Sequence, residues 1–249
     1  MIVSVITVVF NCKEFIGHCL DSVHSQTYQK LEHIIMDGGS SDGTLNVIAE
    51  RADDRVLLFS ASDNGYYDAL NKGIAHANGT IIGILNADDE FADIYALENI
   101  MTCFRNGQYE AVYGNLNYVH RLNSQRILRE WKGAPYDIDK FHYGWMPPHP
   151  TVYLKRQLFS LYGNYSLDFG SSADYELMIR FMYRNRINTF FLDQLLINMR
   201  AGGMSNGSFN KILNASLQDY QVLKSHHFFM CWVIVIMKKL RKLEQFFYL

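Results

Sequence analysis

The sequence predicts an α/β protein in which a doubly wound, mostly parallel central sheet is flanked by helices. Short apolar segments alternate with amphipathic ones through residues 1–90, as such a sheet requires. Residues 81–85 are apolar throughout, which is typical of a parallel strand buried on both faces. The first four apolar segments each end in polar or acidic residues. Because ligands bind open α/β sheets at the carboxyl ends of the strands, these residues predict a binding site.

Composition sets broad limits on the fold and on the partners. A chain of 249 residues with 49% hydrophobic content suits one domain of ordinary size, with or without a small appendage. The net charge of −2 gives no indication of nucleic-acid binding. The four cysteines form no CxxC pair, so we expect reduced thiols in a cytoplasmic protein. Residues 1–10 are apolar but lack a basic region and a cleavage site, which favours a first strand over a signal peptide.

The elements of the first half follow from hydrophobic periodicity. Residues 14–26 carry apolar side chains at helical spacing, and glycine-rich turns separate the segments that follow. We therefore expect strands at residues 3–10, 31–36, 56–60 and 81–85, and helices at 14–26, 44–52 and 67–77.

The second half is less regular, and helices and strands no longer alternate strictly. We expect helices at residues 95–106, 155–161 and 170–184, and a largely helical tail at 210–249. Strands are expected at 111–114, 116–120, 151–154, 189–192 and 195–199, with 126–131 pairing to its neighbours and a loop at 134–150.

Three adjacent carboxylates follow the fourth strand, namely Asp88, Asp89 and Glu90. Like charges this close repel one another, and burying them is costly unless a cation lies among them. A hard divalent cation such as Mg2+ or Mn2+, which would in turn hold a diphosphate, fits this position. A solvated loop that caps a helix explains the same residues, because aspartate is favoured at helix N-termini.

Polar side chains at the other strand ends extend this pattern. Asn11, Asp37, Asp63 and Asp88 each follow one of the first four strands, so we expect them to face one crevice. Asp37 is placed to accept hydrogen bonds from a nucleotide base or a ribose hydroxyl, although residues 37–39 also read as a tight glycine turn. Neither GxGxxG nor GxxxxGK[ST] is present, which argues against a dinucleotide fold and a P-loop.

Four motifs, in order, resemble family 2 glycosyltransferases of the GT-A fold. They are SVITVVFN at residues 4–11, DGGSSDGT at 37–44, DNGYYDALNKG at 63–73 and LNADD at 85–89. The resemblance runs from about residue 3 to 205 and is strongest to bacterial enzymes of O-antigen and colanic acid assembly. It divides the chain into a catalytic domain at 1–209, with a nucleotide-binding half at 1–90 and an acceptor-binding half at 91–209, and a helical tail at 210–249.

The resemblance implies roles for residues of the first half. Asp37 would contact the uracil, and Asn86 to Asp88 take the place of the family's Asp-x-Asp motif, whose last acid, here Asp88, binds Mn2+ or Mg2+. Asn86 replaces the first acid of that motif, and Asp89 could compensate for it. The residues implied for the nucleotide sugar are Thr7, Asn11, Asp37, Gly38, Asp63, Gly65, Lys72, Asn86, Ala87 and Asp88.

Three residues of the second half match further family positions. Asp174 corresponds to the catalytic base, or is simply a carboxylate in the first turn of a helix. His149, in a Pro-His-Pro sequence, matches a loop that faces the acceptor or the metal, or is a buried structural histidine. Arg200 precedes a Gly-Gly-Met-Ser sequence that resembles a mobile loop over the diphosphate, or is a surface turn.

Together these positions imply an inverting, metal-dependent glycosyltransferase. It would move a hexose or N-acetylhexosamine from a UDP-sugar to a lipid-linked saccharide of the undecaprenyl diphosphate type, in bacterial cell-surface polysaccharide synthesis. One base and in-line attack imply inversion, because a retaining enzyme needs a second carboxylate as nucleophile. The rival hypotheses are a sugar-nucleotide-binding protein without turnover, which Asn86 keeps open, and a nucleotidyltransferase, for which a lysine-bearing phosphate loop is missing.

The tail combines an apolar run with basic residues. Residues 228–237 carry no charge, and Lys238, Lys239, Arg241 and Lys242 follow. Ten residues are too few to span a bilayer, which takes about 20. The pattern predicts a helix lying on the anionic inner face of the cytoplasmic membrane, with packing on the core or a homodimer partner as the alternatives.

Overall fold

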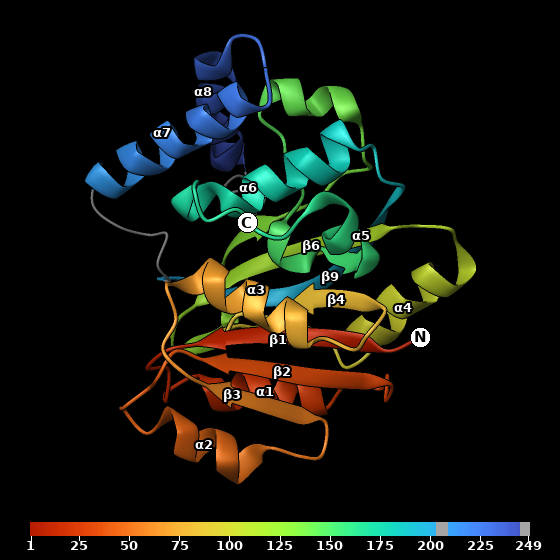
Figure 1. The fold of residues 1–249 in the computed structure, drawn as a ribbon, viewed down its shortest axis with the longest axis vertical. Helices are drawn as coiled ribbons and strands as arrows, with labels where there is room; N and C mark the ends of the chain where they lie inside the picture. The colour runs from red at the N-terminus through yellow and green to blue at the C-terminus, as the bar shows by residue number, and fades with distance from the viewer. Residues whose placement is uncertain (203–208, 245–249) are drawn as a thin grey trace.

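The structure is a computed structural model that describes residues 1–202 and 209–244. Over these residues one nine-stranded sheet forms the centre of the molecule, in the order β3-β2-β1-β4-β8-β6-β9-β5, with β7 paired to β6 (Figure 1). Helices lie on both faces of this sheet. The predicted α/β class is confirmed.

The first half follows the predicted alternation closely. The strands β3, β2, β1 and β4 pair in parallel, so their carboxyl ends meet at one edge. All seven side chains of β1 are buried or nearly so, as expected for a strand between two helical layers. The elements are β1 (Val3–Val9), α1 (Ile16–His24), β2 (Leu31–Asp37), α2 (Thr44–Arg51), β3 (Val56–Ser60), α3 (Tyr66–His76) and β4 (Ile81–Ile84).

The second half departs from the prediction in its strands. Residues 111–120 form one strand rather than two, with an irregularity between Tyr113 and Asn115, and residues 189–200 likewise form one. The two-residue strand β5 was too short for periodicity to reveal. The elements are β5 (Glu90–Phe91), α4 (Ala96–Asn106), β6 (Ala111–His120), β7 (Asn123–Trp131), β8 (Tyr153–Lys155) and β9 (Thr189–Arg200).

Short helical turns fill the segments between these strands. The expected loop at 134–150 contains two 3-10 turns, and the expected helix at 170–184 is a 3-10 turn, an α-helix and a π-helix in succession. They are η1 (Ile138–Tyr143), η2 (His149–Thr151), α5 (Gln157–Tyr162), η3 (Gly170–Ser172), α6 (Ala173–Met178) and the π-helix η4 (Ile179–Arg184). π-helical turns are rare and often lie near functional sites.

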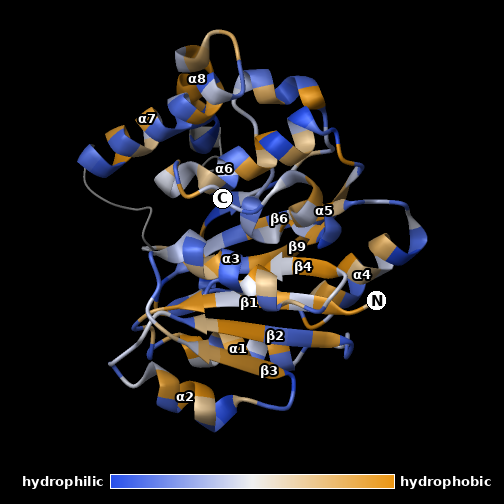
Figure 2. Cartoon of the chain, in the orientation of Figure 1, coloured by the Kyte–Doolittle hydropathy of each residue, from blue (hydrophilic) through white to orange (hydrophobic). Residues whose placement is uncertain are grey.

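Two hydrophobic cores occupy the two faces of the sheet, and Figure 2 shows the apolar strands between them. One core joins the sheet to α1, α2 and α4, through residues such as Leu20, Ile48 and Ile100. The other joins it to α3, α6 and the C-terminal helices, through residues such as Leu70 and Tyr175. The parallel strands are thus fixed on both sides, which holds their carboxyl ends in place.

The C-terminal residues form a helical hairpin, α7 (Phe209–Ser225) and α8 (Cys231–Glu244), which lies beyond α6 at the opposite end of the molecule from α2 (Figure 1). Val222, Leu223, Ile234 and Val235 are buried in the core that includes α6. The inner face of the tail therefore packs on the domain. Among the helices described, none is long and apolar enough to cross a membrane.

Candidate functional site

The loops after β1 and β2 are joined at the carboxyl edge of the sheet. Asn11 adopts a left-handed backbone conformation, with φ of 48°. Its side-chain oxygen accepts a hydrogen bond from the amide of Ser41, and its own amide donates to the hydroxyl of Ser40. Asn11 therefore holds the two loops together, and it also lines a hollow at this edge.

Asp37 ends β2 and shapes the turn that follows it. Its carboxylate accepts hydrogen bonds from the amides of Gly39 and Ser40 and, at 2.6 Å, from the hydroxyl of Ser60 on the adjacent strand. The residue is 2% exposed. The glycine-turn interpretation of this motif thus describes what the carboxylate does here, and a contact with a base stays a prediction.

Asp63 lies against the same turn. A side chain on Gly38 would meet a carboxylate oxygen of Asp63 at 2.8 Å, so only glycine permits this approach without a shift. The other carboxylate oxygen accepts the amide hydrogen of Gly65, whose φ of 105° is unfavourable for other residues. Gly38, Asp63 and Gly65 thus form one compact corner beside the ends of β2 and β3.

Two residues assigned to the nucleotide have other partners in the structure. Thr7 is fully buried, and its hydroxyl bonds to the carbonyl of Leu85 and to His33. Its side chain does not reach the cleft, so a direct nucleotide contact is not supported. Lys72 pairs with Asp68 at 2.8 Å on the surface of α3, one turn apart. Its role toward the phosphates is still only predicted.

The residues after β4 form a polar chain in which only Asp88 is left free to bind a ligand. Asn86 donates from its amide to Asp89 at 2.7 Å and accepts from the hydroxyl of Tyr66 at 2.6 Å, while Ala87 is buried. Burial raises the pKa of Asp88, whose side chain is 24% exposed. Asp88 is therefore the carboxylate of this motif that a ligand can reach.

Asp89 and Arg200 turn inward, contrary to the prediction. Asp89 is 1% exposed and accepts the backbone amide of Arg200, so it does not compensate for Asn86 at the cleft. Burial, with the nearby charge of Asp88, raises the pKa of Asp89 to about 8. The Arg200 side chain is buried and pairs with Glu90 at 3.0 Å. Gly203 to Ser205, the rest of the expected mobile loop, lie outside the described residues.

A basic residue that the sequence did not reveal completes this edge. Arg121, at the tip of the β6–β7 hairpin, lies 3.9 Å from Asp88 and 4.4 Å from the centre of the Phe15 ring. It lines a hollow of about 490 Å³ together with Asn11, Cys12, Lys13, Glu14, Phe15 and Asp42. Arg121 comes from a distant part of the chain, and no motif marks it. Its guanidinium and the Lys13 side chain are suited to an anionic group.

The donor set at Asp88 fits a metal that arrives with a diphosphate. Within residues 1–202 and 209–244, no group of three acidic, histidine or cysteine side chains could hold an ion alone. Mg2+ is usually bound by one or two carboxylates and by substrate phosphates rather than by a protein cage. One free carboxylate beside a basic hollow meets that description.

Asp174, on the first turn of α6, faces His149. The Nε2 atom of His149 lies 3.0 Å from a carboxylate oxygen of Asp174, and the imidazole packs edge-on against Trp131. Burial lowers the pKa of His149, and the Asp174 carboxylate opposes that shift. Its Nδ1 atom is buried without a partner among the described residues, as expected of a neutral ring that donates from Nε2.

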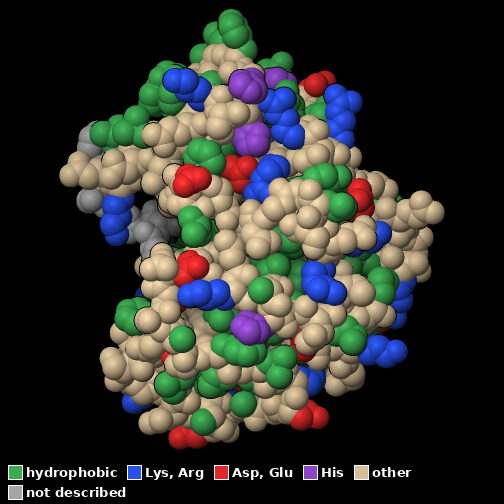
Figure 3. Space-filling view, in the orientation of Figure 1, with side chains coloured by type: hydrophobic (Ala, Val, Ile, Leu, Met, Phe, Trp, Pro, Cys, Tyr) green, Lys and Arg blue, Asp and Glu red, His purple; other side chains and the backbone are tan. Residues whose placement is uncertain are grey.

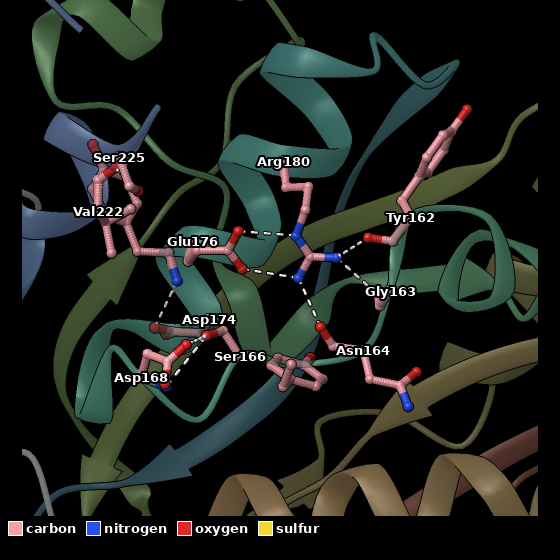
Figure 4. Close-up of polar contacts among 12 residues, drawn as sticks. Tyr162, Gly163, Asn164, Ser166, Asp168, Asp174, Glu176, Arg180, Val222 and Ser225 are labelled. Atoms are coloured by element: carbon pink, nitrogen blue, oxygen red, sulfur yellow. Dashed lines mark hydrogen bonds and ion pairs between the residues drawn. The ribbon is translucent and has the colours of Figure 1, made fainter. Parts of the chain in front are cut away.

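Arg180 fixes the helix that carries Asp174. Its guanidinium binds both oxygens of Glu176 and the backbone carbonyls of Tyr162, Gly163 and Asn164 (Figure 4). This arginine therefore ties α6 and η4 to the loop after α5. No sequence motif marks this arginine, because most of the groups that it binds are backbone carbonyls.

Tyr66 connects the two acidic regions. Burial raises the pKa of Tyr66 well above its ordinary value, and Tyr165 and the charges of Asp89, Asp174 and Asp88 add to that shift. The hydroxyl of Tyr66 donates to Asn86, two residues before Asp88, and its ring packs edge-on against Tyr67. The hydroxyl of Tyr67 in turn donates to the carbonyl of Ser171, three residues before Asp174. Asp88 and Asp174 border one region of the molecule rather than two remote sites.

Comparison with known sequences identifies relatives over most of the chain. The profile described as Glycosyl transferase family 2 matches residues 4–173. A PGL/p-HBAD biosynthesis glycosyltransferase of Mycobacterium bovis is 30% identical over 210 residues, which cover 82% of this chain and 78% of that protein. An uncharacterised glycosyltransferase of Mycobacterium tuberculosis is 32% identical over 72% of this chain and 68% of its own length.

Solved structures with the same fold include nucleotide complexes. TarS 1–349 of S. aureus, in complex with UDP-GlcNAc, superposes with a TM-score of 0.67 at 16% identity, over 90% of this chain and 67% of that one. The chain spans 40% of another, longer TarS structure. A mannosyltransferase of Pyrobaculum calidifontis with GDP-Man and Mn2+ has a TM-score of 0.63 at 21% identity, over 90% of this chain and 63% of that one.

Proposed function

Because the chain belongs to glycosyl transferase family 2, we propose that it transfers a hexose or N-acetylhexosamine from a UDP-sugar, with inversion, to a saccharide acceptor. The observation that supports this most directly is the pairing of Asp174 with His149, across from the free carboxylate of Asp88. One side of the cleft can accept a proton, and the other can hold an anionic leaving group. An inverting transfer needs both.

Asp174 is the base of the proposed reaction. An acceptor hydroxyl is a poor nucleophile, and a carboxylate that takes its proton as attack proceeds contributes about 10²- to 10⁴-fold to the rate. The hydrogen bond from His149 orients this carboxylate. With Asp174 as a single base and in-line attack we expect inversion, because a retaining enzyme would need a second carboxylate as covalent nucleophile.

Asp88, Arg121 and Lys13 form the proposed diphosphate side. Asp88 would hold Mn2+ or Mg2+, and the ion would supply Lewis-acid stabilisation of the charge on the departing nucleoside diphosphate. Arg121 lies 3.9 Å from Asp88 and lines the same hollow as Lys13. The complexes of structural neighbours with UDP-GlcNAc, and with GDP-Man and Mn2+, support a metal-bound sugar nucleotide. GDP-sugars are therefore the main alternative donors to compare with UDP-sugars in a donor screen.

The acceptor we propose is a saccharide on a lipid diphosphate of the undecaprenyl type, used in bacterial cell-surface polysaccharide assembly. The outer face of the hairpin supports a membrane location. Val233, Ile236 and Leu240 follow one another at helical spacing on α8 and are 43%, 56% and 56% exposed, and Phe229, just before α8, is 84% exposed.

The hairpin also carries the charges that an anionic bilayer attracts. Lys239, Arg241 and Lys242 lie on α8, and the ammonium of Lys239 contacts the carbonyl of Ile212 on α7 at 3.3 Å. Leu213 and Leu217 of α7 are 48% and 42% exposed. Figure 3 shows hydrophobic side chains over this end of the molecule, with basic side chains nearby. Charge complementarity thus favours an anionic lipid surface over a homodimer partner.

The transferase proposal is tested with purified protein, Mn2+, a panel of UDP- and GDP-sugars, and lipid-linked acceptor. Transfer with release of UDP supports it. Asp174→Asn should reduce turnover by at least about 10²-fold while UDP affinity, measured by calorimetry, stays within about 3-fold. Tight binding of a sugar nucleotide without UDP release by the wild type would instead favour a binding protein.

The membrane location is tested with vesicles of phosphatidylglycerol or of phosphatidylcholine, neither containing acceptor. Wild type should sediment with the anionic vesicles at low salt, and Ile236→Glu should not. Wild type that stays in the supernatant at low salt contradicts the lipid surface. A concentration-dependent doubling of mass, abolished by Ile236→Glu, would point to a homodimer on this face.

A further inference from the structure

The helix that carries Asp174 is not positioned by its own sequence alone. α6 has six residues, and no side chain caps its N-terminus. Isolated helices this short are unstable in water, so outside contacts must fix the direction of the Asp174 carboxylate. Arg180 supplies some of these contacts from the C-terminal side. The contacts on the N-terminal side come from another part of the chain.

The α7 helix holds the two residues that precede α6. The side-chain oxygen of Gln218 accepts hydrogen bonds from the amide and the hydroxyl of Ser171, at 3.1 and 2.8 Å. The next residue, Asp219, accepts the hydroxyl of Ser172 at 2.8 Å. A side chain on Gly170 would meet the Gln218 amide at 2.3 Å, so the two segments are in close contact.

The hairpin also holds the two residues that follow Asp174. The ammonium of Lys238 lies 3.5 Å from the centre of the Tyr175 ring and 2.7 Å from Asp219. The imidazole of His226 lies 3.1 Å from the carboxylate of Glu176. Both helices of the hairpin, and the residue after α7, therefore contact the segment around Asp174.

The hairpin contacts the residues on both sides of Asp174. Ser171, Ser172, Tyr175 and Glu176 are held by it, and Ala173 is fully buried. The Asp174 carboxylate itself pairs with His149. The side chains of Lys238 and Asp219 are 12% and 11% exposed, so their ion pair is largely shielded from water. A surface appendage without a role at the site would not need such contacts with this particular segment.

We propose that the α7–α8 hairpin positions the Asp174 carboxylate for catalysis, with Gln218 as the main positioning residue. This inference rests on the transferase function proposed above. Gln218 does not touch substrate; it acts through the backbone and hydroxyl of Ser171, three residues before Asp174. A base displaced by about 1 Å can lose about 10²-fold in rate, so contacts at this distance are large enough to matter.

The test compares Gln218→Ala, Gln218→Glu and the control Gln221→Ala, an exposed residue of the same helix. Gln218→Ala should lower kcat about 10- to 100-fold and leave the KM for the sugar nucleotide within about 2-fold. Gln218→Glu keeps the acceptor oxygens and should recover most of kcat. Gln221→Ala should match wild type. Equal kcat values for Gln218→Ala and wild type would overturn the proposal.

A second measurement separates this proposal from the transferase function. In hydrogen exchange, the peptide spanning residues 170–178 should exchange faster in Gln218→Ala than in wild type or Gln221→Ala, while peptides of β1 to β4 stay unchanged. Unchanged exchange at 170–178 would overturn the positioning role, whatever the activity. If wild type transfers no sugar but this peptide still loses protection, the contact stands and the proposed transferase function fails.

Discussion

The two sides of the site are built in different ways. On the nucleotide side, polar side chains close their own loops: Asp37 bonds to residues two and three positions later, and Asp63 to the second residue after it. On the base side, His149 reaches Asp174, and Gln218 and His226 reach across 47 and 50 residues to Ser171 and Glu176. The proposed nucleotide side consists mainly of turns on adjacent parallel strands, joined by Asn11 and Ser60, whereas the proposed base side is assembled from distant segments.

This difference predicts how substitutions on each side should affect binding, activity and stability. Local turns keep their shape when one ligand-binding side chain is removed, so a substitution there should affect binding and little else. The base side depends on tertiary contacts, so substitutions there should disturb the position of Asp174 or the stability of the domain. The four predictions below run from the largest expected effect to the smallest.

Asp88→Ala should have the largest effect, and it should change donor binding and transfer without changing the fold. Removing the carboxylate that a metal and diphosphate can reach should weaken Mn2+-dependent donor binding by about 10²-fold or more and abolish transfer. The fold should be unchanged, because within the part of the chain that the structure describes the Asp88 side chain has no hydrogen bond to a distant segment and only a 3.9 Å contact with Arg121. Calorimetry with UDP and Mn2+ measures the loss. Wild-type affinity in this variant would place the metal elsewhere.

Arg180→Ala should act on stability. The variant leaves the Glu176 carboxylate without its bidentate partner and three backbone carbonyls without their donor. Breaking a buried ion pair in this way costs about 3 kcal/mol of unfolding free energy. Urea denaturation measures it, and Arg184→Ala, an exposed arginine of the same π-helix, is the control. Equal losses in the two variants would show that the clamp contributes nothing specific.

The sequence correctly predicted the first four strands and their parallel arrangement, whereas the roles of the residues at their ends stay predictions. Asn11, Asp37, Asp63 and Asp88 lie at the ends of the first four strands or within four residues of them, so parallel pairing alone brings them to one edge. What periodicity cannot show is side-chain direction. Thr7 sits on a correctly predicted strand, yet it is fully buried.

The base side could be predicted only in part. The motif that resembles the family placed Asp174 on a helix, but its neighbours come from segments that no spacing rule connects. Gln218 and Arg121 lie in sequence stretches without a motif, and Arg180 bonds largely to backbone atoms. The tail was predicted as a membrane-facing or core-packed helix, and its inner face does pack on the core.

Arg121→Ala tests whether a residue from a hairpin tip contributes to donor binding beside the strand-end loops. Arg121 is about half exposed and comes from a hairpin tip rather than from a strand-end loop. Losing one charged contact to a diphosphate should raise the KM for the donor about 10-fold, with kcat and unfolding free energy little changed. Steady-state kinetics measure the shift, with Arg126→Ala on the same hairpin as the control. An unchanged KM would remove Arg121 from the donor site.

Asp89→Asn should have the smallest effect, on the pH dependence of stability. The unfolded carboxyl ionises near pH 4, whereas burial raises the pKa of Asp89 in the folded state to about 8. The folded protein therefore keeps the proton longer, and its stability from this group is lost as pH rises from about 4 toward 8. The midpoints of urea unfolding at pH 5 and pH 8 should differ less in Asp89→Asn than in wild type. The control Asp54→Asn, at an exposed position, should keep the wild-type difference between the two pH values. Only this difference is compared, because the new amide also faces the side chain of Asn86 and lowers stability at both pH values. An identical difference in wild type and Asp89→Asn would mean that Asp89 is already ionised at pH 5, with a cation or a basic group offsetting its burial.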